Sequence, residues 1–261
     1  MNAGHPPLPA DDPALILDVL CQHRPVHPYG IYDVANLWNV SRWWLRDRAV
    51  VGLMDLPGSP VPVVYAVSAD AAEQTLALMG DLAPLFPPHF IVTGPPGLTE
   101  RHAGDYDAMW WAPHLKMHLA RPDDLPPPQR DVFPLDRGDV SELERFFALT
   151  VDAGAFFHPG LLDTGHYVGL RQGTELIAVA GIHVVDQRYR VAALGNVATH
   201  PAHRRRGLAR AVTATLCAQL LNEVDVIGLN VRQDNAAARV LYERMGFAAV
   251  ADYEEAELIA R

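Results

Sequence analysis

The sequence has little cysteine, no long apolar run and no excess of positive charge. Its 261 residues include two cysteines, Cys21 and Cys217, too few and too far apart for a disulfide framework. No apolar stretch is long enough to span a bilayer, and residues 1–13 lack the basic start and apolar core of a secretory signal. We therefore expect a cytoplasmic protein without a membrane partner.

The charge balance excludes further classes of partner. Lysine and arginine together number 21 against 31 aspartates and glutamates, which gives a formal net charge of -10 with histidine neutral. Nucleic acids and anionic membranes favour basic surfaces, so we expect neither as a partner. An acidic chain is compatible with a cationic or amine-bearing substrate, although its charge does not require one.

What the sequence has in quantity is proline, and its clustering indicates the domain organisation. Pro126, Pro127 and Pro128 follow two aspartates, in a stretch that can form neither a helix nor a central strand. We therefore expect a linker near 125–131, with an N-terminal domain at 1–125 and a second domain at 131–261.

Hydrophobic spacing and turn residues predict alternating strands and helices. In the first half we expect helices at 12–23, 32–37 and 69–79 and strands at 43–53, 61–67, 90–92 and 109–119. In the second half we expect helices at 139–152, 208–221 and 235–245 and strands at 167–171, 175–185, 189–199, 226–231 and 247–259.

The segment 195–210, GNVATHPAHRRRGLAR, carries the clearest chemical signal. It joins a predicted strand to a predicted helix through a basic turn that contains Gly207. Glycine allows positive φ and close approach of a ligand, and a helix N-terminus presents unpaired N–H groups at the positive end of the helix dipole. Together with Arg204, Arg205, Arg206 and Arg210, these features predict a phosphate-binding turn. Taken alone, an arginine run is more often only a solvated surface.

Two familiar phosphate motifs are absent from this turn. The Gly-Lys-Ser/Thr element of a P-loop is missing, and no GxGxxG follows the strand.

The segment resembles a known family signature instead. Arg204, Gly207 and Ala209 match the Q/R-x-x-G-x-G/A pattern of the GNAT superfamily of acyl-CoA-dependent N-acyltransferases. Within that superfamily, the sequence most resembles the FR47-like branch. The downstream stretch 229–247, LNVRQDNAAARVLYERMGF, is similar to the second part of that signature. The resemblance covers 132–261 and is most specific over 196–247.

The resemblance implies an α/β (α+β) fold with a mixed, mostly antiparallel sheet flanked by helices, and acetyl-CoA as cofactor. It implies that the backbone of Val197, Ala198 and Thr199 binds the pantetheine arm and that Asn235 contacts the cofactor nearby. The expected diphosphate-binding residues are Arg204, Arg205, Arg206, Gly207, Leu208, Ala209 and Arg210. The N-terminal domain is expected to be either a diverged GNAT-like copy or a separate cap over the acceptor site.

The resemblance also implies a catalytic role for Tyr242 close to the cofactor sulfur. Acyl transfer from a thioester releases a thiolate with a pKa of about 8.5, and a phenol with a pKa near 10 can protonate it. Tyr242 could instead be a half-buried core residue, and Asn235 could also serve as the helix N-cap.

The usual glutamate base of this family has no counterpart here, because 193–196 and 229–231 contain no carboxylate. Either a water chain carries the amine proton, or His158, His166, His183 or Asp152 accepts it. We expect Phe157, His158 and His183 to contact the acceptor.

No metal site is expected. His114 and His118 have i, i+4 spacing, but Pro113 opposes a helix there and the glutamate of HExxH is absent.

The function expected from these observations is transfer of an acetyl group from acetyl-CoA to the amine of a small molecule or peptide by direct attack. The alternative is a catalytically weak acyl-CoA-binding or sensor protein of the same fold. A homodimer is compatible with either function.

Overall fold

The computed structural model describes residues 7–56, 59–150 and 157–261. The chain forms two compact units, the first made of Met1–Lys116, Val231–Asn235 and Ala249–Arg261 and the second of Met117–Asn230 and Ala236–Ala248. The units are therefore not the two consecutive segments expected from the proline linker. Over the described residues, no helix combines the length and apolar composition that crossing a membrane requires.

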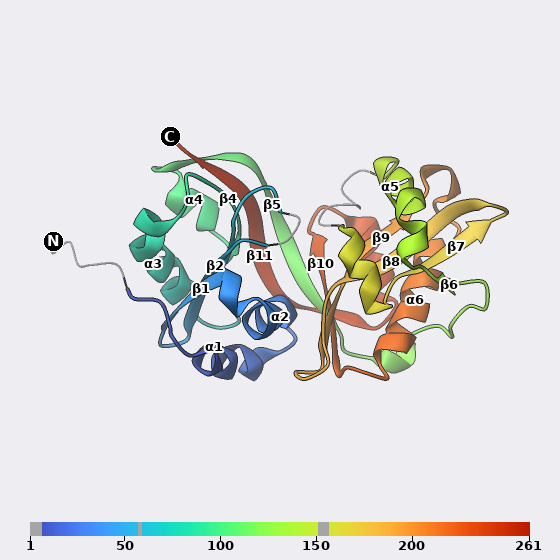
Figure 1. Ribbon diagram of the computed structural model, residues 1–261, viewed down its shortest axis with the longest axis horizontal. Coiled ribbons are helices and arrows are strands. Elements are labelled where there is room, and N and C mark those ends of the chain that lie inside the picture. The colour runs from blue at the N-terminus through green and yellow to red at the C-terminus, as the bar shows by residue number, and fades with distance from the viewer. Residues whose placement is uncertain (1–6, 57–58, 151–156) are drawn as a thin grey trace. The chain divides into compact units, whose positions relative to one another are not determined.

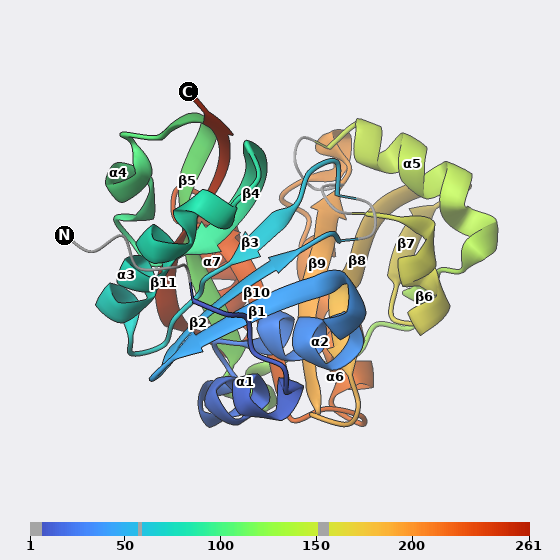
Figure 2. The ribbon, with the colours of Figure 1, turned by 60° about the vertical axis from the view of Figure 1, so that its left-hand side comes forward.

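The first unit contains helices and a sheet with strand order β1-β2-β3-β4-β11-β5 (Figures 1 and 2). All pairs with a described register are antiparallel except β3 with β4, which is parallel. Its elements are α1 (Pro13–Leu20), α2 (Pro28–Asn36), β1 (Ser41–Arg46), β2 (Ala49–Met54), β3 (Val63–Tyr65), α3 (Ala72–Leu82), β4 (His89–Gly94), α4 (Leu98–His102), β5 (Tyr106–Leu119) and β11 (Phe247–Ala260).

The strand expected at 43–53 is two strands, β1 and β2. They form a hairpin whose turn contains Asp47 at φ +53, a conformation that aspartate tolerates better than most residues. Trp43 and Trp44 are adjacent on β1 and are both buried. Successive side chains point to opposite faces of a sheet, so both faces of this sheet are covered.

The second unit has strand order β10-β9-β8-β7-β6, and α6 packs on β7, β8 and β9 (Figure 1). Only the β9–β10 pair is parallel among these strands. Its elements are β6 (Phe133–Pro134), α5 (Val140–Ala148), β7 (Val168–Gln172), β8 (Glu175–Asp186), β9 (Val191–Thr199), α6 (Leu208–Leu220), β10 (Val226–Arg232) and α7 (Ala236–Glu243). The mixed, mostly antiparallel sheet with flanking helices that the sequence predicted is confirmed.

The long C-terminal strand explains why the units interleave along the chain. Residues 254–259 of β11 pair with 89–94 of β4, so the end of the chain completes the first unit. Glu254 on this strand is buried, and its carboxylate accepts hydrogen bonds from the backbone N–H groups of Gly97 (2.8 Å) and Thr99 (3.2 Å). A carboxylate at a helix N-terminus is stabilising, and here it links α4 to β11.

A buried polar cluster lies in the first unit. His27 Nδ1 is 2.8 Å from the Tyr65 hydroxyl, and Lys116 Nζ lies over the rings of Tyr29 (5.1 Å) and Tyr253 (4.7 Å). Burial, aided by the nearby Lys116 charge, lowers the pKa of His27 to about 3. Burial also raises the pKa of Asp33 to about 7 and lowers that of Lys116 to about 8. Folding therefore keeps His27 neutral over the whole physiological range.

This burial predicts an acid sensitivity that belongs to His27. The unfolded chain binds a proton at His27 below pH 6.5 and the folded chain only near pH 3, so stability is lost as pH falls through this window. We expect wild type to lose up to about 5 kcal/mol of unfolding free energy relative to His27→Gln between pH 7 and pH 3. Chemical denaturation at each pH measures the free energy of unfolding of both proteins. The contribution of Asp33 cancels in their difference, because Asp33 is present in both.

A second substitution at the same position, His27→Asn, provides the control. It should show the same pH dependence as His27→Gln, because neither amide side chain titrates. A pH-independent difference between wild type and His27→Gln would contradict the prediction.

Candidate functional site

The strand β9 carries an irregularity at the start of the segment singled out from the sequence. Val179 pairs with Ala198 and Gly181 with Gly195, so β9 advances three residues while β8 advances two. The extra residue forms a bulge, and Asn196 lies in it at φ +52. Two residues further along, β8 gains one residue against β9, around His183.

The bulge coincides with a change in strand pairing. The parallel pairing of β9 with β10 covers 191–194 against 226–229, and β9 then continues to Thr199 paired with β8. Val197, Ala198 and Thr199 thus lie beyond the described register with β10. The family resemblance places the pantetheine-binding backbone at these three residues.

The turn after β9 has the backbone geometry expected of an anion-binding loop. Gly207 precedes α6 at φ +78 and ψ 7, and among the described residues no side chain caps the helix N-terminus. Arg205 also has positive φ, at +63. Arg204, Arg205, Arg206 and Gly207 are exposed, whereas Leu208 and Ala209 are half-buried. The first N–H groups of a thirteen-residue helix therefore face a basic, solvent-accessible turn.

Side-chain contacts hold Arg206 in this turn. Its Nη1 is 2.7 Å from His203 Nδ1 and donates to Gln172 Oε1 at 3.2 Å. Arginine has only donors, so His203 Nδ1 must accept and its ring proton lies on Nε2. The guanidinium is thus oriented before any ligand binds.

The residues Glu175, His200 and His203 have ligand atoms within 4.8 Å of one another, as a metal site would need. The tautomers oppose metal binding, however. The Ala202 N–H donates to His200 Nδ1 at 3.2 Å, as Arg206 does to His203 Nδ1. Both Nε2 atoms therefore carry protons and face the Glu175 carboxylate, at 3.6 Å for His200 and 3.4 Å for His203. We assign the trio as an electrostatic cluster that supports the turn.

Tyr242 lies on α7 and is buried. Its ring packs edge-on against Phe247 at 5.6 Å between centroids. Burial, with a contribution from nearby Cys217, raises the pKa of the Tyr242 phenol, so the hydroxyl keeps its proton at neutral pH. Burial likewise raises the pKa of the Cys217 thiol to about 12, which fits a structural rather than a nucleophilic cysteine.

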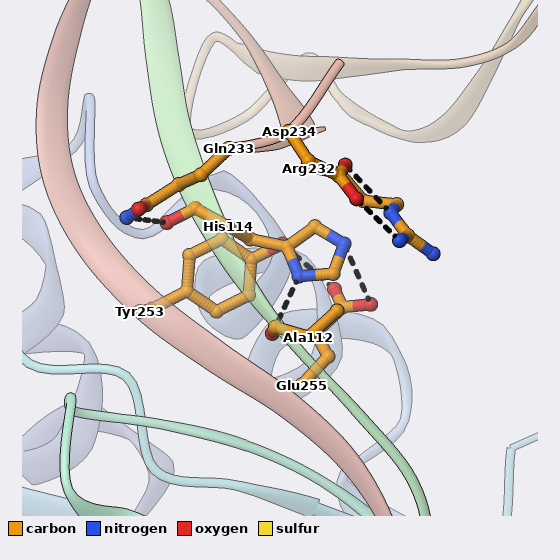
Figure 3. Close-up of polar contacts among 7 residues, drawn as sticks. All are labelled: Ala112, His114, Arg232, Gln233, Asp234, Tyr253 and Glu255. Atoms are coloured by element: carbon orange, nitrogen blue, oxygen red, sulfur yellow. Dashed lines mark hydrogen bonds and ion pairs between the residues drawn. The ribbon is translucent and has the colours of Figure 1, made fainter.

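Asn235 stands directly before α7 and is grouped with the first unit. Figure 3 shows two neighbouring contacts, from Gln233 Nε2 to the His114 carbonyl at 3.4 Å and between Arg232 and Asp234. The backbone N–H of Gln233 donates to the Pro113 carbonyl at 2.9 Å, and its Nε2 donates to Asp252 Oδ1 at 2.8 Å. These contacts fix the short segment that leads into α7.

His114 and His118 are not arranged as joint metal ligands. Both lie on strand β5, where an i, i+4 spacing separates residues by about 13 Å. His114 Nδ1 donates to the Ala112 carbonyl at 3.0 Å, and its Nε2 faces Glu255 at 3.6 Å (Figure 3).

The residues predicted to contact the acceptor come together around the bulge. The Phe157 ring contacts Tyr167, with centroids 5.9 Å apart. The Tyr167 hydroxyl donates to Asn196 Oδ1 at 2.7 Å, and His183 is hydrogen-bonded to Asn196. His158 lies close enough to lower the pKa of His183 by charge repulsion. The phenylalanine, both histidines and the bulge thus form one cluster.

The environment of His183 limits what it can do as a base. His183 is half-buried as a residue, and its Nε2 atom is buried. Burial lowers the pKa of His183 to about 4, against an opposing effect of the Asn196 hydrogen bond. The ring is therefore neutral at physiological pH but is a weak base.

The two remaining candidates for the base differ from His183. His166 Nε2 is 3.1 Å from Glu223 Oε1, beyond the C-terminal end of α6. Its neighbour Tyr167 donates to Asn196, whereas the described hydrogen bond of the His166 ring is with Glu223, so we do not group His166 with the cluster. Asp152 lies outside the described residues.

The sequence interpretation missed Tyr167 and Asn196. The signal that could have found them is glycine inside predicted strands, which often marks close approach of another group. A Cβ on Gly181 would overlap the Tyr167 ring, and a Cβ on Gly195 would overlap the His183 ring.

Comparison with known proteins agrees with this geometry. Residues 132–247 match the family model of the acetyltransferase (GNAT) family. No curated protein matches the sequence significantly. A Drosophila melanogaster protein is similar in fold over 98% of this chain and 99% of its own, with a TM-score of 0.71 at 14% identity.

Two further solved structures share the fold. A GCN5-related N-acetyltransferase from Kribbella flavida has a TM-score of 0.57 at 18% identity, over 90% of this chain and 95% of its own. A tandem GNAT protein from the clavulanic acid biosynthesis pathway has a TM-score of 0.56 at 13% identity, over 97% of each chain. Residues 132–247 thus match the acetyltransferase (GNAT) family model, and these solved structures share the fold of the chain.

The overlap at Gly195 gives a test of the cluster. Gly195→Ala should displace the His183 ring and destabilise the protein by about 1–3 kcal/mol, because overpacking forces side chains and backbone to move. Urea unfolding measures the change. Gly104→Ala is the control, since a Cβ there meets no neighbour. Equal stability of the two variants would show that His183 does not occupy this position.

Proposed function

We propose that the protein transfers an acetyl group from acetyl-CoA to an amine acceptor by direct attack, without a covalent enzyme intermediate. The observation that carries the proposal is the N-terminus of α6, which directly follows Gly207 and the exposed residues Arg204, Arg205 and Arg206. That arrangement suits a diphosphate, which accepts several backbone hydrogen bonds and carries charge for the helix dipole and the guanidinium groups.

In this proposal the cofactor runs from the turn along the end of β9. The N–H groups from Arg205 to Arg210 bind the diphosphate, and the backbone of Val197, Ala198 and Thr199 binds the pantetheine arm. Asn235 adds a contact near the pantetheine. The backbone N–H groups at the end of β9, beyond its described register with β10, can provide the donors that stabilise an oxyanion.

The reaction divides into attack and release. The amine nitrogen attacks the thioester carbonyl carbon and forms a tetrahedral oxyanion, which backbone N–H groups stabilise. The C–S bond then breaks, and Tyr242 donates its proton to the departing CoA thiolate. Burial raises the pKa of the Tyr242 phenol, so the hydroxyl is protonated when the thiolate forms but is a weaker acid than a free phenol.

The amine proton needs a separate acceptor. His158 and His183 lie in the cluster beside the bulge, and we propose this cluster, with Phe157, as the acceptor side of the site. Because His183 is a weak base, it suits the acidic N–H of the tetrahedral intermediate better than a free ammonium group. A water chain is the alternative acceptor.

A second candidate function is acyl-CoA binding without efficient turnover. The observation that favours it is the absence of a carboxylate at 193–196 and 229–231. The two functions share the cofactor turn and differ in whether free thiol is released in the presence of an amine. Three further points stay predictions. They are an acceptor that is a small molecule or a peptide, a homodimeric state and a cytoplasmic location.

The role of Tyr242 is tested by removing one oxygen atom. Tyr242→Phe should lower kcat by about 100-fold or more, with little change in the KM for acetyl-CoA, because only the proton donor is lost. A thiol-release assay across a panel of amines measures both constants. Tyr189→Phe, in the β8–β9 turn, is the matched control and should retain wild-type rates. Unchanged kcat in Tyr242→Phe would exclude the proposed acid.

The role of the turn is tested by comparing two acyl donors. Arg206→Ala should weaken the binding of acetyl-CoA by about 10-fold, the effect of losing one charge-assisted hydrogen bond. It should not affect the use of acetyl-pantetheine, because that acyl donor has no diphosphate. The ratio of kcat/KM for the two donors is the readout. Equal losses for both donors would mean that Arg206 acts on the fold rather than on the diphosphate.

A further inference from the structure

The two units repeat one arrangement around their parallel strand pair. In the second unit, α6 connects β9 to its parallel partner β10. In the first unit, α3 connects β3 to its parallel partner β4 (Figure 2). The N-terminus of α3 therefore corresponds in topology to the N-terminus of α6, where we propose that the CoA diphosphate binds.

The two helix N-termini differ in every feature that matters for an anion. The residue before α6 is glycine at positive φ, whereas the residue before α3 is Ala71 at φ -128. The segment 66–82 contains no lysine or arginine, in contrast to the four arginines at 204–210. The Ser68 hydroxyl already accepts a hydrogen bond from the Ala71 N–H at 2.8 Å.

Acidic side chains take the place of the arginines in the first unit. Asp70 directly precedes Ala71, and Glu73 stands in the first turn of α3. Carboxylates favour a helix N-terminus and repel a second anion there. The neighbouring cation Arg48 forms an ion pair with Asp70 and donates to His23 Nε2 at 3.1 Å, so its charge is already balanced.

The space at this position is also small. The hollow lined by His23, Arg48, Ser68 and Asp70 has an accessible volume of only about 10 Å³, no more than the space that one water molecule needs. Charge, backbone conformation and available space thus all disfavour a bound diphosphate at the N-terminus of α3.

We infer that the chain binds a single CoA, at the turn before α6, and that the corresponding position in the first unit is closed by the chain's own side chains. The first unit keeps the topology of an acyl-CoA domain without its cofactor site. This inference rests on the proposed function, because it assumes that the turn before α6 binds CoA.

Calorimetric titration of the full chain with CoA tests the number of sites. We expect a stoichiometry of one, and a stoichiometry of two would overturn the inference. Hydrogen exchange locates the site in the same wild-type protein. CoA should slow exchange of backbone N–H groups at 204–211 and leave 66–74 unchanged, and protection confined to 66–74 would overturn the inference.

Two sets of variants separate the units. Gly207→Val forces a β-branched residue into positive φ, while its Cβ would meet no neighbour, so the strain is confined to the turn. It should weaken CoA binding by at least about 30-fold. Ser68→Ala and Asp70→Ala, at the corresponding position of the first unit, should leave Kd within about 2-fold of wild type.

The outcomes also distinguish this inference from the proposed function. Full binding retained in Gly207→Val and lost in Ser68→Ala or Asp70→Ala would place the CoA in the first unit and overturn the inference alone. Absence of CoA binding in wild type would overturn the proposed function, and the single-site inference with it.

Discussion

The second unit depends on the point where β9 gains one residue against β8. Asn196 occupies this bulge at positive φ, which asparagine adopts at lower cost than most residues. Neighbouring side chains hold the bulge in place. The Tyr167 hydroxyl donates a hydrogen bond to Asn196 Oδ1, and His183 is hydrogen-bonded to the same side chain. Gly181 and Gly195 leave the space that these two rings fill. Beyond the bulge, the end of β9 leads directly into the basic turn and α6.

Local charge, rather than net charge, decides what the turn can bind. The chain carries a formal charge of -10, yet four arginines gather within seven residues at the N-terminus of α6. Charges in solvent are screened beyond about 8–10 Å at physiological salt, so acidic residues elsewhere do little to cancel this patch. The first unit shows the reverse arrangement, since Asp70 and Glu73 stand at the start of α3. One topology therefore supports opposite electrostatic environments.

Histidine tautomers carry much of the chemical information in this structure. Accepting contacts at Nδ1 fix the protons of His200 and His203 on Nε2, toward Glu175. A donor set with the composition of a metal site thereby becomes a support for Arg206. His183 has a different environment, because burial keeps it neutral and weakens it as a base. Identical side chains within one unit thus have different chemical roles.

Much of the fold could be predicted from the sequence, since helices and strands of the second half have regular apolar spacing. The helix expected at 208–221 is α6 at Leu208–Leu220, and the strand expected at 175–185 is β8 at Glu175–Asp186. The hairpin of β1 and β2 was missed because its turn at Asp47 contains neither glycine nor proline. Without such a turn signal, the apolar residues on either side of it predict one strand. The α4 helix was also missed, because its five residues are too few to show a period.

The sequence by itself determined the basic turn, because a strand end, Gly207 and a helix start are contiguous and each depends on local backbone preferences. Only the tertiary structure decided that Phe157, His158, Tyr167, His183 and Asn196 form one cluster, since they come from separate segments. Their meeting depends on strand register, and two bulges set that register. Likewise, only pairing of β11 with β4 placed the C-terminal residues in the first unit. A strand's sequence specifies which of its faces is buried, but its hydrogen-bonding partner depends on the packing of the whole sheet.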